Sequence, residues 1–486
     1  MINIRAQALI LIVFAGLNAA LFLFATNNSP AKDINSNLAL HPTFSNAPDG
    51  HRYWGVAKNL VDGLGFKYQN KVTGELHSLV RGGPLPPIIF FTPIKLFGTK
   101  GAAAAIVSIQ CLLLYLTALI LWRVANTFGV PPTLTQVLCL FNPILIISAH
   151  HAQSEIVFTF FLALFLMIGS SLVSSATNKA VNSGLLGFFV GCMYLARPAS
   201  TFALIGITLI FLFLTFSNKT QGQFKFREML VCVSFLILSA LLTASPWLIR
   251  NGQITPGNQL FSPLPNTATS INDNLIELLY YGDRTSNWDE YANPNKRETY
   301  LLVSKHLAKI DSKAVGCLSD VRSDTHNEPV TKVGFRSPTD SDCLALINKA
   351  VILSILSQDI ETWLKAGTRA VLVTIFAGGG STLNRYLGLD NIGSQASTKA
   401  GDILYFSILG LNCFFHVLAI FGLLFYLKSH QSDRSNWLML FTIFIFIASY
   451  GFIGNARFRV PLDPIFMLYA SYMMKLCIAK FRRFQH

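Results

Sequence analysis

Charged residues are scarce in this sequence. Only 13% of its 486 residues are Asp, Glu, Lys or Arg, whereas 52% are hydrophobic. A soluble domain carries about 25% charged residues, so this composition excludes an ordinary soluble domain and favours a chain that lies largely in a lipid bilayer. A cleavable signal is also lacking, and the first apolar run, residues 9–25, is interpreted as a retained helix.

Acidic residues are scarcer than basic ones. The chain has 24 acidic and 38 basic side chains, which gives a net charge of +14. This excess suits anionic lipid headgroups or a phosphate-bearing substrate. Basic chains also bind nucleic acid, but here the basic residues lie between apolar segments rather than in runs, so we expect no nucleic-acid partner.

The common catalytic motifs are missing. No Gly-rich phosphate loop, HExxH or G-x-S-x-G occurs in a context that supports its chemistry. His51, His150 and His151 could join Asp49 and Glu155 as metal ligands, but their spacing does not match a tight site. We therefore expect no cofactor, and a bound divalent metal stays the alternative.

Cysteine is nearly confined to the apolar segments. Only Cys317 and Cys343 lie in a long polar stretch, and a disulfide between them is expected if that stretch is extracytoplasmic. The others are interpreted as small buried hydrophobes, namely Cys111, Cys139, Cys192, Cys232, Cys413 and Cys477.

Long apolar segments recur along the chain, and about 20 residues are needed to cross ~30 Å of hydrocarbon. The run 84–98 is short and holds four prolines, so we predict an interfacial helix there rather than a span. Residues 361–378 are predicted to form an amphipathic helix lying on the membrane. About ten spans are expected, at 7–26, 101–123, 131–149, 155–174, 181–196, 199–217, 228–248, 402–427, 436–455 and 458–477.

The charges of the short loops predict the orientation. With a cytoplasmic N-terminus and no crossing at 84–98, every short cytoplasmic loop is basic, as the positive-inside rule requires. Both termini are then cytoplasmic. The predicted regions are an N-terminal transmembrane module at 1–248 with its outer loop at 27–100, an extracytoplasmic region at 249–401, and C-terminal transmembrane helices at 402–486.

Two acidic residues stand at helix starts on the predicted outer face. Apolar residues recur at three- and four-residue spacing from Tyr53 to Leu64, which predicts a short amphipathic helix that Asp49 precedes. Asp49 could simply cap that helix. Glu155 opens an apolar span, where the helix dipole favours an acid, but an ionisable group at a span boundary also indicates function.

Arginines gather on the same predicted face. Arg81 lies beside Gly82 and Gly83, which would let a ligand approach the backbone closely. A single arginine at this depth is usually a snorkelling anchor. As a set, the arginines favour binding of a phosphate or pyrophosphate, and the remaining members, all at outer span ends, are Arg197, Arg250, Arg457 and Arg459.

Taken in order, these motifs resemble the GT-C superfamily of membrane glycosyltransferases. The resemblance is to the bacterial relatives of dolichyl-phosphate-mannose protein mannosyltransferases, which include the lipid A aminoarabinose transferases. It runs along nearly the whole chain. The matching motifs are Asp49 followed by Y-x-x-x-A-K-N-L-x-x-G-x-G-F (Tyr53 to Phe66), R-G-G-P-L-P-P (Arg81 to Pro87), S-E (Ser154, Glu155), R-P (Arg197, Pro198), P-W-L-I-R-N (Pro246 to Asn251) and R-F-R-V-P-L-D-P (Arg457 to Pro464).

The resemblance implies an all-α polytopic fold with a GT-C-like bundle, and a site on the first outer loop. Asp49 matches the family's general base, Glu155 its second acidic position, and Arg81 its group near the donor phosphate. Where many relatives carry a second acid after the base, this chain has Gly50. Accessory roles are considered for His51, Tyr53, His150 and His151.

The expected function is transfer of a sugar from a polyprenyl-phosphate donor to a lipid, glycan or protein acceptor. Such transfer needs a base for the acceptor hydroxyl and positive charge for the departing phosphate. We expect an integral protein of the bacterial inner membrane with its site outside the cytoplasm. The alternatives are a transporter or flippase of lipid-linked glycans, which should show broken helices and acidic residues near the bilayer midplane, and a non-catalytic membrane scaffold.

Overall fold

The computed structural model describes residues 4–28, 31–32, 39–45, 50–69, 76–79, 82–174, 179–216, 226–254, 360–376, 383–384, 386–387, 389, 398–430, 434–450 and 456–484. The chain divides into two compact units. The first unit comprises Met1–Ser262, Ile375–Ser449 and Ala456–His486, and the second comprises Pro263–Thr374 and Tyr450–Asn455. Apart from most of one helix and Tyr450, the described residues belong to the first unit.

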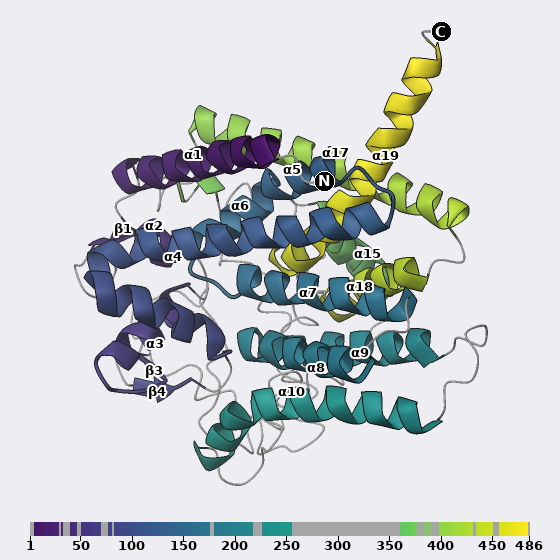
Figure 1. Ribbon diagram of the computed structural model, residues 1–486. Coiled ribbons are helices and arrows are strands. Elements are labelled where there is room, and N and C mark those ends of the chain that lie inside the picture. The colour runs from purple at the N-terminus through teal and green to yellow at the C-terminus, as the bar shows by residue number, and fades with distance from the viewer. Residues whose placement is uncertain are drawn as a thin grey trace. The chain divides into compact units, whose positions relative to one another are not determined.

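The described chain is helical, with two short hairpins (Figure 1). The strands pair antiparallel as β1 (Ala31–Lys32) with β2 (Ala39–Leu40) and β3 (Lys67–Gln69) with β4 (Leu76–Ser78). The helices are α1 (Ile4–Asn28), α2 (Pro42–Ser45), α3 (Gly50–Val61), α4 (Leu85–Thr127), α5 (Pro132–Leu140), α6 (Pro143–His150), α7 (Glu155–Ser174), α8 (Lys179–Ala196), η1 (Pro198–Ser200), α9 (Thr201–Phe216), α10 (Phe226–Ile254), α15 (Ile360–Phe376), α17 (Lys399–Ser429), α18 (Arg434–Tyr450), η5 (Ala456–Leu462) and α19 (Asp463–Phe484).

Seven helices in the described ranges are long and apolar enough to cross a membrane, and they lie in seven of the predicted spans. An eighth crossing is made if α5 and α6, bent by 50° at their junction, count as one span. The bend lies at Asn142, whose side-chain oxygen accepts hydrogen bonds from the amides of Ile144 (3.0 Å) and Leu145 (3.4 Å). Pro143 follows, in the first turn of α6, so the cap and the proline start a new helix there.

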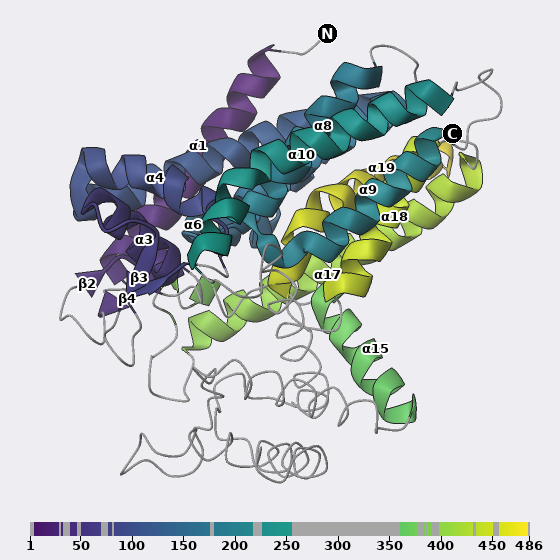
Figure 2. The same cartoon turned by 90° about the horizontal axis from the view of Figure 1, so that it is seen from below.

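The two remaining predicted spans, 199–217 and 436–455, correspond to the shorter apolar helices α9 and α18. Helices α8 and α10 run in the same direction, because Gly187 packs on Leu236 and Gly191 on Thr243. Figure 2 shows these two helices side by side. The chain must therefore run back in the opposite direction between α8 and α10, and α9 is the helix that does so.

The same arrangement recurs at the C-terminal end. Helices α17 and α19 also run in the same direction, since His416 contacts Asp463 and Gly422 packs on Tyr469. Helix α18 returns the chain between them. The predicted class, an all-α polytopic membrane protein, is confirmed, and the predicted set of about ten spans corresponds to seven long helices, one bent pair and two shorter helices.

Helix α4 contains both the predicted interfacial helix and the second span. Gly98 interrupts it with a φ of 64°, a left-handed conformation that glycine adopts most readily. The apolar helix Leu85–Thr99 is thereby set off from the candidate span Gly101–Thr127. The structure thus separates the two segments at the end of the short, proline-rich run 84–98 that the sequence predicts to be a helix of its own.

The first loop forms the predicted amphipathic helix, which is α3. Tyr53, Trp54 and Ala57 are buried against α4, and the ring of Trp54 stacks on Phe44 at 4.0 Å between centroids. After α3 the chain turns at Gly63, whose φ is 76°, and enters β3. This packing holds the start of α3, and with it the residue after Asp49, against the bundle.

Candidate functional site

Glu155 is the centre of the candidate site. It is the first residue of α7, and its carboxylate is fully buried. Its Oε1 accepts a hydrogen bond from Nε of Arg457 and lies 3.4 Å from Nη1 of Arg197. Its Oε2 has no hydrogen-bond partner among the described residues. Two arginines that the sequence analysis assigned to phosphate binding are therefore paired with the second predicted acid.

The arginine at 81 belongs to a segment that lies next to this group. Arg81 itself is outside the described residues, but Gly83 packs directly on the carbonyl groups of Leu195 and Ala196, at the end of α8. A Cβ at position 83 would overlap both carbonyl oxygens. The R-G-G motif thus reaches the backbone that leads into Arg197, and only glycine permits so close an approach.

Arg250 holds the segment that precedes Arg81. Its Nη1 donates to the carbonyl oxygen of Leu79 (2.8 Å) and to Oδ1 of Asn251 (2.8 Å), and its Nη2 donates to the carbonyl oxygen of Phe66 (3.1 Å). Its guanidinium also lies over the rings of Trp247 and Phe66, at 4.4 and 5.4 Å. Arg250 therefore ties the β3–β4 hairpin to α10.

The first loop contacts the segment that precedes Glu155. The amide of Ala152 donates to the carbonyl oxygen of Thr43 (3.0 Å), which joins the segment before Glu155 to α2. Tyr53 is 5% exposed, and a Cβ at Gly82 would lie 3.5 Å from its ring. Asp49 and the side chain of His51 are outside the described residues.

The predicted accessory histidines are buried. His150 lies between the hydroxyl of Tyr386 (Nδ1, 2.9 Å) and Oδ1 of Asn18 (Nε2, 2.9 Å). His151 contacts the carbonyl oxygen of Ile147 through Nδ1 (2.7 Å), and its Nε2 has no partner in the described chain. A third histidine, His41, has its pKa lowered to about 4 by burial and by the neighbouring His151. These side chains build a polar layer between the first loop and α6.

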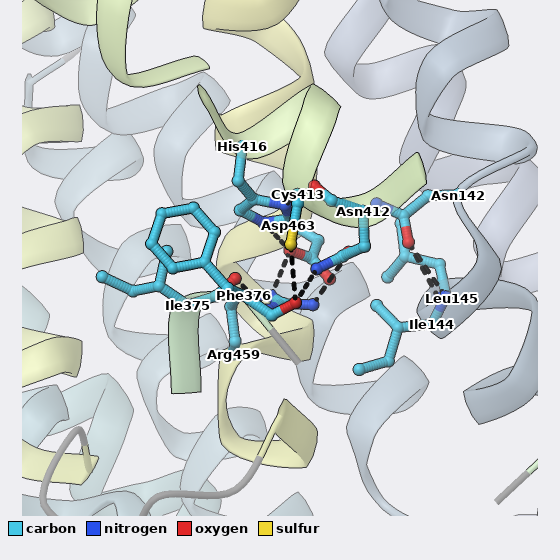
Figure 3. Close-up of polar contacts among 10 residues, drawn as sticks. All are labelled: Asn142, Ile144, Leu145, Ile375, Phe376, Asn412, Cys413, His416, Arg459 and Asp463. Carbon is cyan, nitrogen blue, oxygen red and sulfur yellow. Dashed lines mark hydrogen bonds and ion pairs between the residues drawn. The ribbon is translucent and has the colours of Figure 1, made fainter. Parts of the chain in front are cut away.

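Arg459, also on η5, binds a different acidic residue, Asp463 (Figure 3). Its Nε donates to Oδ1 of Asp463 (2.8 Å), its Nη2 to Oδ1 of Asn412 (3.1 Å), and its Nη1 to the carbonyl oxygen of Ile375. The side chain is 1% exposed. Its predicted contact with a donor phosphate stays a prediction, and the described contacts are all internal.

Two residues of this second group were not singled out from the sequence. His416 and Asp463 are fully buried and lie 3.0 Å apart. A signal existed for His416, because an ionisable residue inside an apolar span indicates a specific partner. Asp463 belongs to the R-F-R-V-P-L-D-P motif but had no assigned role. As to metals, no group of three or more candidate ligands occurs in the part of the chain that the structure describes.

The comparisons with known proteins rest on structure alone. No known protein-family profile and no curated protein sequence matches the chain. The archaeal oligosaccharyltransferase AglB from Archaeoglobus fulgidus, solved with an inhibitory peptide and a dolichol-phosphate, aligns with a TM-score of 0.50 and 12% identity. The alignment covers 99% of this chain and 51% of AglB, so the chain spans about half the length of that enzyme.

ArnT from Cupriavidus metallidurans bound to undecaprenyl phosphate aligns with a TM-score of 0.40 and 12% identity, over 93% of this chain and 77% of ArnT. Its apo state aligns over the same shares with a TM-score of 0.38 and 10% identity. The likeness to AglB extends over the whole bundle described above and includes the helices that carry Glu155, Arg197 and Arg457. The chain thus shares the fold of the aligned part of AglB, at a TM-score of 0.50.

Proposed function

We propose that this protein is a glycosyltransferase that moves a sugar from a polyprenyl-phosphate donor to an acceptor. The observation that carries the proposal is the convergence of separate motifs at one place in a GT-C fold. Glu155, Arg197 and Arg457 come from three elements far apart in the sequence and meet at one carboxylate oxygen. The R-G-G motif packs on the residues before Arg197.

The charges of this group suit a phosphate. Two guanidinium groups share one carboxylate, so the three side chains together carry one excess positive charge. In a buried site such a charge acts at a low effective dielectric, where it stabilises an anion more than it would in water. Arginine also offers paired N–H donors that match phosphate oxygens. We assign donor-phosphate binding to Arg81, Arg197 and Arg457.

Glu155 then has an orienting role in addition to any contact with substrate. A buried carboxylate that binds two arginines fixes the direction of both guanidinium groups before a donor arrives, and preorganised charge of this kind is effective in catalysis. Arg250 and Arg459, which bind backbone carbonyl groups, are proposed to shape the site by holding the first hairpin and η5 in place.

Asp49 is proposed as the general base toward the acceptor hydroxyl. It directly precedes α3, which packs on α4 beside the segment of Gly82. The acceptor is a lipid, a glycan or a protein, and the protein is proposed to act at the outer face of a bacterial inner membrane. Solved GT-C relatives bound to dolichol-phosphate or undecaprenyl phosphate support a donor of this lipid class.

The test is transfer from a panel of radiolabelled polyprenyl-phosphate sugars by the full chain in lipid nanodiscs, with membrane extracts as acceptor. We expect one donor to give labelled product. Asp49→Asn should lower turnover by about 10²–10⁴-fold with donor affinity retained, because it removes the base but not the size or capping ability of the side chain. Asp62→Asn, at the exposed end of α3, is the matched control.

Two results would contradict the proposal. If no donor is consumed but labelled lipid crosses the bilayer of proteoliposomes, the protein is a flippase. If Asp49→Asn turns over at the wild-type rate, Asp49 is a helix cap and the base lies elsewhere.

A further inference from the structure

A buried ionic cluster surrounds Arg459 of η5. We define it by His416 of α17, Arg459 of η5 and Asp463 of α19, all at most 1% exposed (Figure 3). An edge-to-face ring contact adds to the enclosure, since the ring centroid of Phe466 lies 5.0 Å from that of His416. Cys139 of α5 is close enough to interact electrostatically with Asp463.

The hydrogen bonds of His416 constrain its protons. Its Nδ1 lies 2.8 Å from the carbonyl oxygen of Asn412, and its Nε2 lies 3.0 Å from Oδ1 of Asp463. A carbonyl oxygen can only accept a hydrogen bond, and the same holds for an ionised carboxylate. A neutral imidazole has one N–H, so with an ionised Asp463 one ring nitrogen would face an acceptor without a proton.

We infer that His416 and Asp463 jointly hold one proton more than a neutral histidine and an ionised aspartate would. Either His416 is an imidazolium with both nitrogens donating, or Asp463 is protonated and donates to Nε2. Arg459 donates to the same carboxylate oxygen in both cases. The cluster therefore carries a net charge of +1 in both cases. Either an imidazolium and Arg459 face one ionised Asp463, or Arg459 is the charged member beside a neutral His416 and a neutral Asp463.

Backbone carbonyl groups with partial negative charge lie beside this positive charge. Nη1 of Arg459 donates to the carbonyl oxygen of Ile375, and Nδ2 of Asn412 donates to that of Phe376 (2.8 Å). These are the last two carbonyl groups of α15. The carbonyl groups at a helix C-terminus lack partners within the helix and carry partial negative charge, so a buried cation is favourable there. Arg459 and Asn412 thus hold the end of α15, and Asp463 in turn holds Arg459.

The same cluster positions the proposed donor site through η5. Arg457 and Arg459 are two residues apart on this short helix, one bound to Glu155 and the other to Asp463. If the pair lost its proton, one ring nitrogen of His416 would face Asp463 or the carbonyl oxygen of Asn412 without a hydrogen bond. The contact that holds the start of α19 and η5 in place would then be weakened. We propose His416 and Asp463 as positioning residues for Arg457, a role that rests on the proposed function.

The proton is tested first, because its measurement needs no activity. Full-length protein labelled with ¹⁵N-histidine and ¹³C-aspartate is placed in nanodiscs at neutral pH, and the His416 signals are identified by their loss in His416→Gln. We expect an imidazolium, or an Nδ1–H tautomer together with a protonated Asp463 carboxyl. A bare Nδ1 with Nε2–H beside an ionised Asp463 would overturn the inference.

The positioning role is tested by binding of the donor lipid used in the transfer assay. His416→Gln should weaken donor affinity or lower turnover on the order of tenfold, because small displacements of a positioned group are costly. His430→Gln, an exposed histidine just after α17, is the control and should match the wild type. Wild-type affinity and turnover in His416→Gln would overturn the positioning role. If the wild type itself transfers no sugar, the proposed function fails while the proton measurement still stands.

Discussion

The pairing of Arg457 with Glu155 defines what a single substitution should do at the candidate site. Arg457→Gln removes a charge-assisted contact to phosphate, which is worth about 1.5–3 kcal/mol, so donor affinity should fall roughly ten- to a hundredfold. Arg457→Lys keeps the charge but not the paired donors and should be intermediate. Arg81→Ala is expected to behave like Arg457→Gln. Binding of a fluorescent polyprenyl phosphate measures these affinities.

The control for Arg457 is Arg123→Gln. Arg123 is exposed on α4 and contributes to no contact of the site. A membrane anchor would change insertion rather than affinity. Equal donor affinity in Arg457→Gln and Arg123→Gln, with normal insertion of both, would refute donor binding by Arg457.

His41 makes the fold sensitive to acid. Its folded pKa of about 4 lies below the usual 6.5, because burial and His151 disfavour the charged form. The unfolded state therefore binds more protons between these values, and stability should be full above pH 6.5 and fall as the pH drops toward 4. Thermal unfolding in nanodiscs at pH 7.5 and 5 measures the loss, which should be a few degrees of Tm.

His41→Gln is the matched variant for this prediction. It should be less stable than the wild type at pH 7.5, since it disturbs contacts of the ring with Thr26 and Thr43. Its Tm should nevertheless change less between pH 7.5 and 5. An equal drop in both proteins would assign the acid sensitivity to other groups.

How far individual residues could be predicted depended on motif order. Glu155, Arg197 and Arg457 were singled out because an ionisable group at a span boundary is unusual and each falls in one of the motifs named above, and their roles stay predictions. Their mutual pairing, and the separate pairing of Arg459 with Asp463, depend on which face of η5 each side chain occupies. Two arginines that are two residues apart in the sequence do not by themselves indicate which face of η5 each one occupies. The roles of Asp49 and Arg81 stay predictions, because both residues lie outside the described ranges.

At the scale of helices, close packing between α17 and α19 depends on one glycine. A Cβ at Gly422 would overlap the carbonyl oxygen of Tyr469, and backbone cannot move aside cheaply. Gly422→Ala should therefore separate the helices and lower Tm by several degrees, since overpacking costs about 1–3 kcal/mol. Thermal unfolding in detergent followed by light scattering measures this effect.

The control lies in the same helix. A Cβ at Gly410 would meet no atom within 4 Å, and alanine favours a helix over glycine by about 1 kcal/mol. Gly410→Ala should be neutral or stabilising. The packing argument is wrong if Gly410→Ala and Gly422→Ala have the same Tm.

The helices themselves were largely predictable, because apolar length alone indicates a span. Hydropathy placed α9 and α18 among the spans although each is short, and the parallel course of their neighbours explains why they belong there. The pairing of α8 with α10 was not predictable from hydropathy. It depends on small residues that let two backbones approach, a property of facing surfaces rather than of one segment.

For the whole molecule, the orientation stays a prediction that rests on the basic short loops. Single cysteines introduced at residues 270–340 in a variant without Cys317 and Cys343 should react with an impermeant maleimide in intact cells. Labelling only after permeabilisation would reverse the predicted topology and move the site to the cytoplasmic face. The region lies outside the described residues.

The predicted Cys317–Cys343 disulfide also lies outside the described residues. Non-reducing peptide mapping of the wild-type protein should recover the two cysteines in one linked peptide. Closure of a loop of this size would contribute about 3 kcal/mol. Recovery of both as free thiols would remove this prediction and weaken the extracytoplasmic assignment of the region.

The partnership of α8 and α10 has a consequence for how the chain is made. Gly187 and Gly191 let α10 pack closely on α8, but α10 follows α9 in synthesis. Helix α8 must therefore enter the membrane and wait there with its interface uncovered until two further helices have left the ribosome. A nascent chain halted after α9 should be prone to degradation, whereas one halted after α10 should persist. The quality-control threshold during biogenesis thus lies at the end of α10, well before the C-terminal helices bring Arg457 to Glu155.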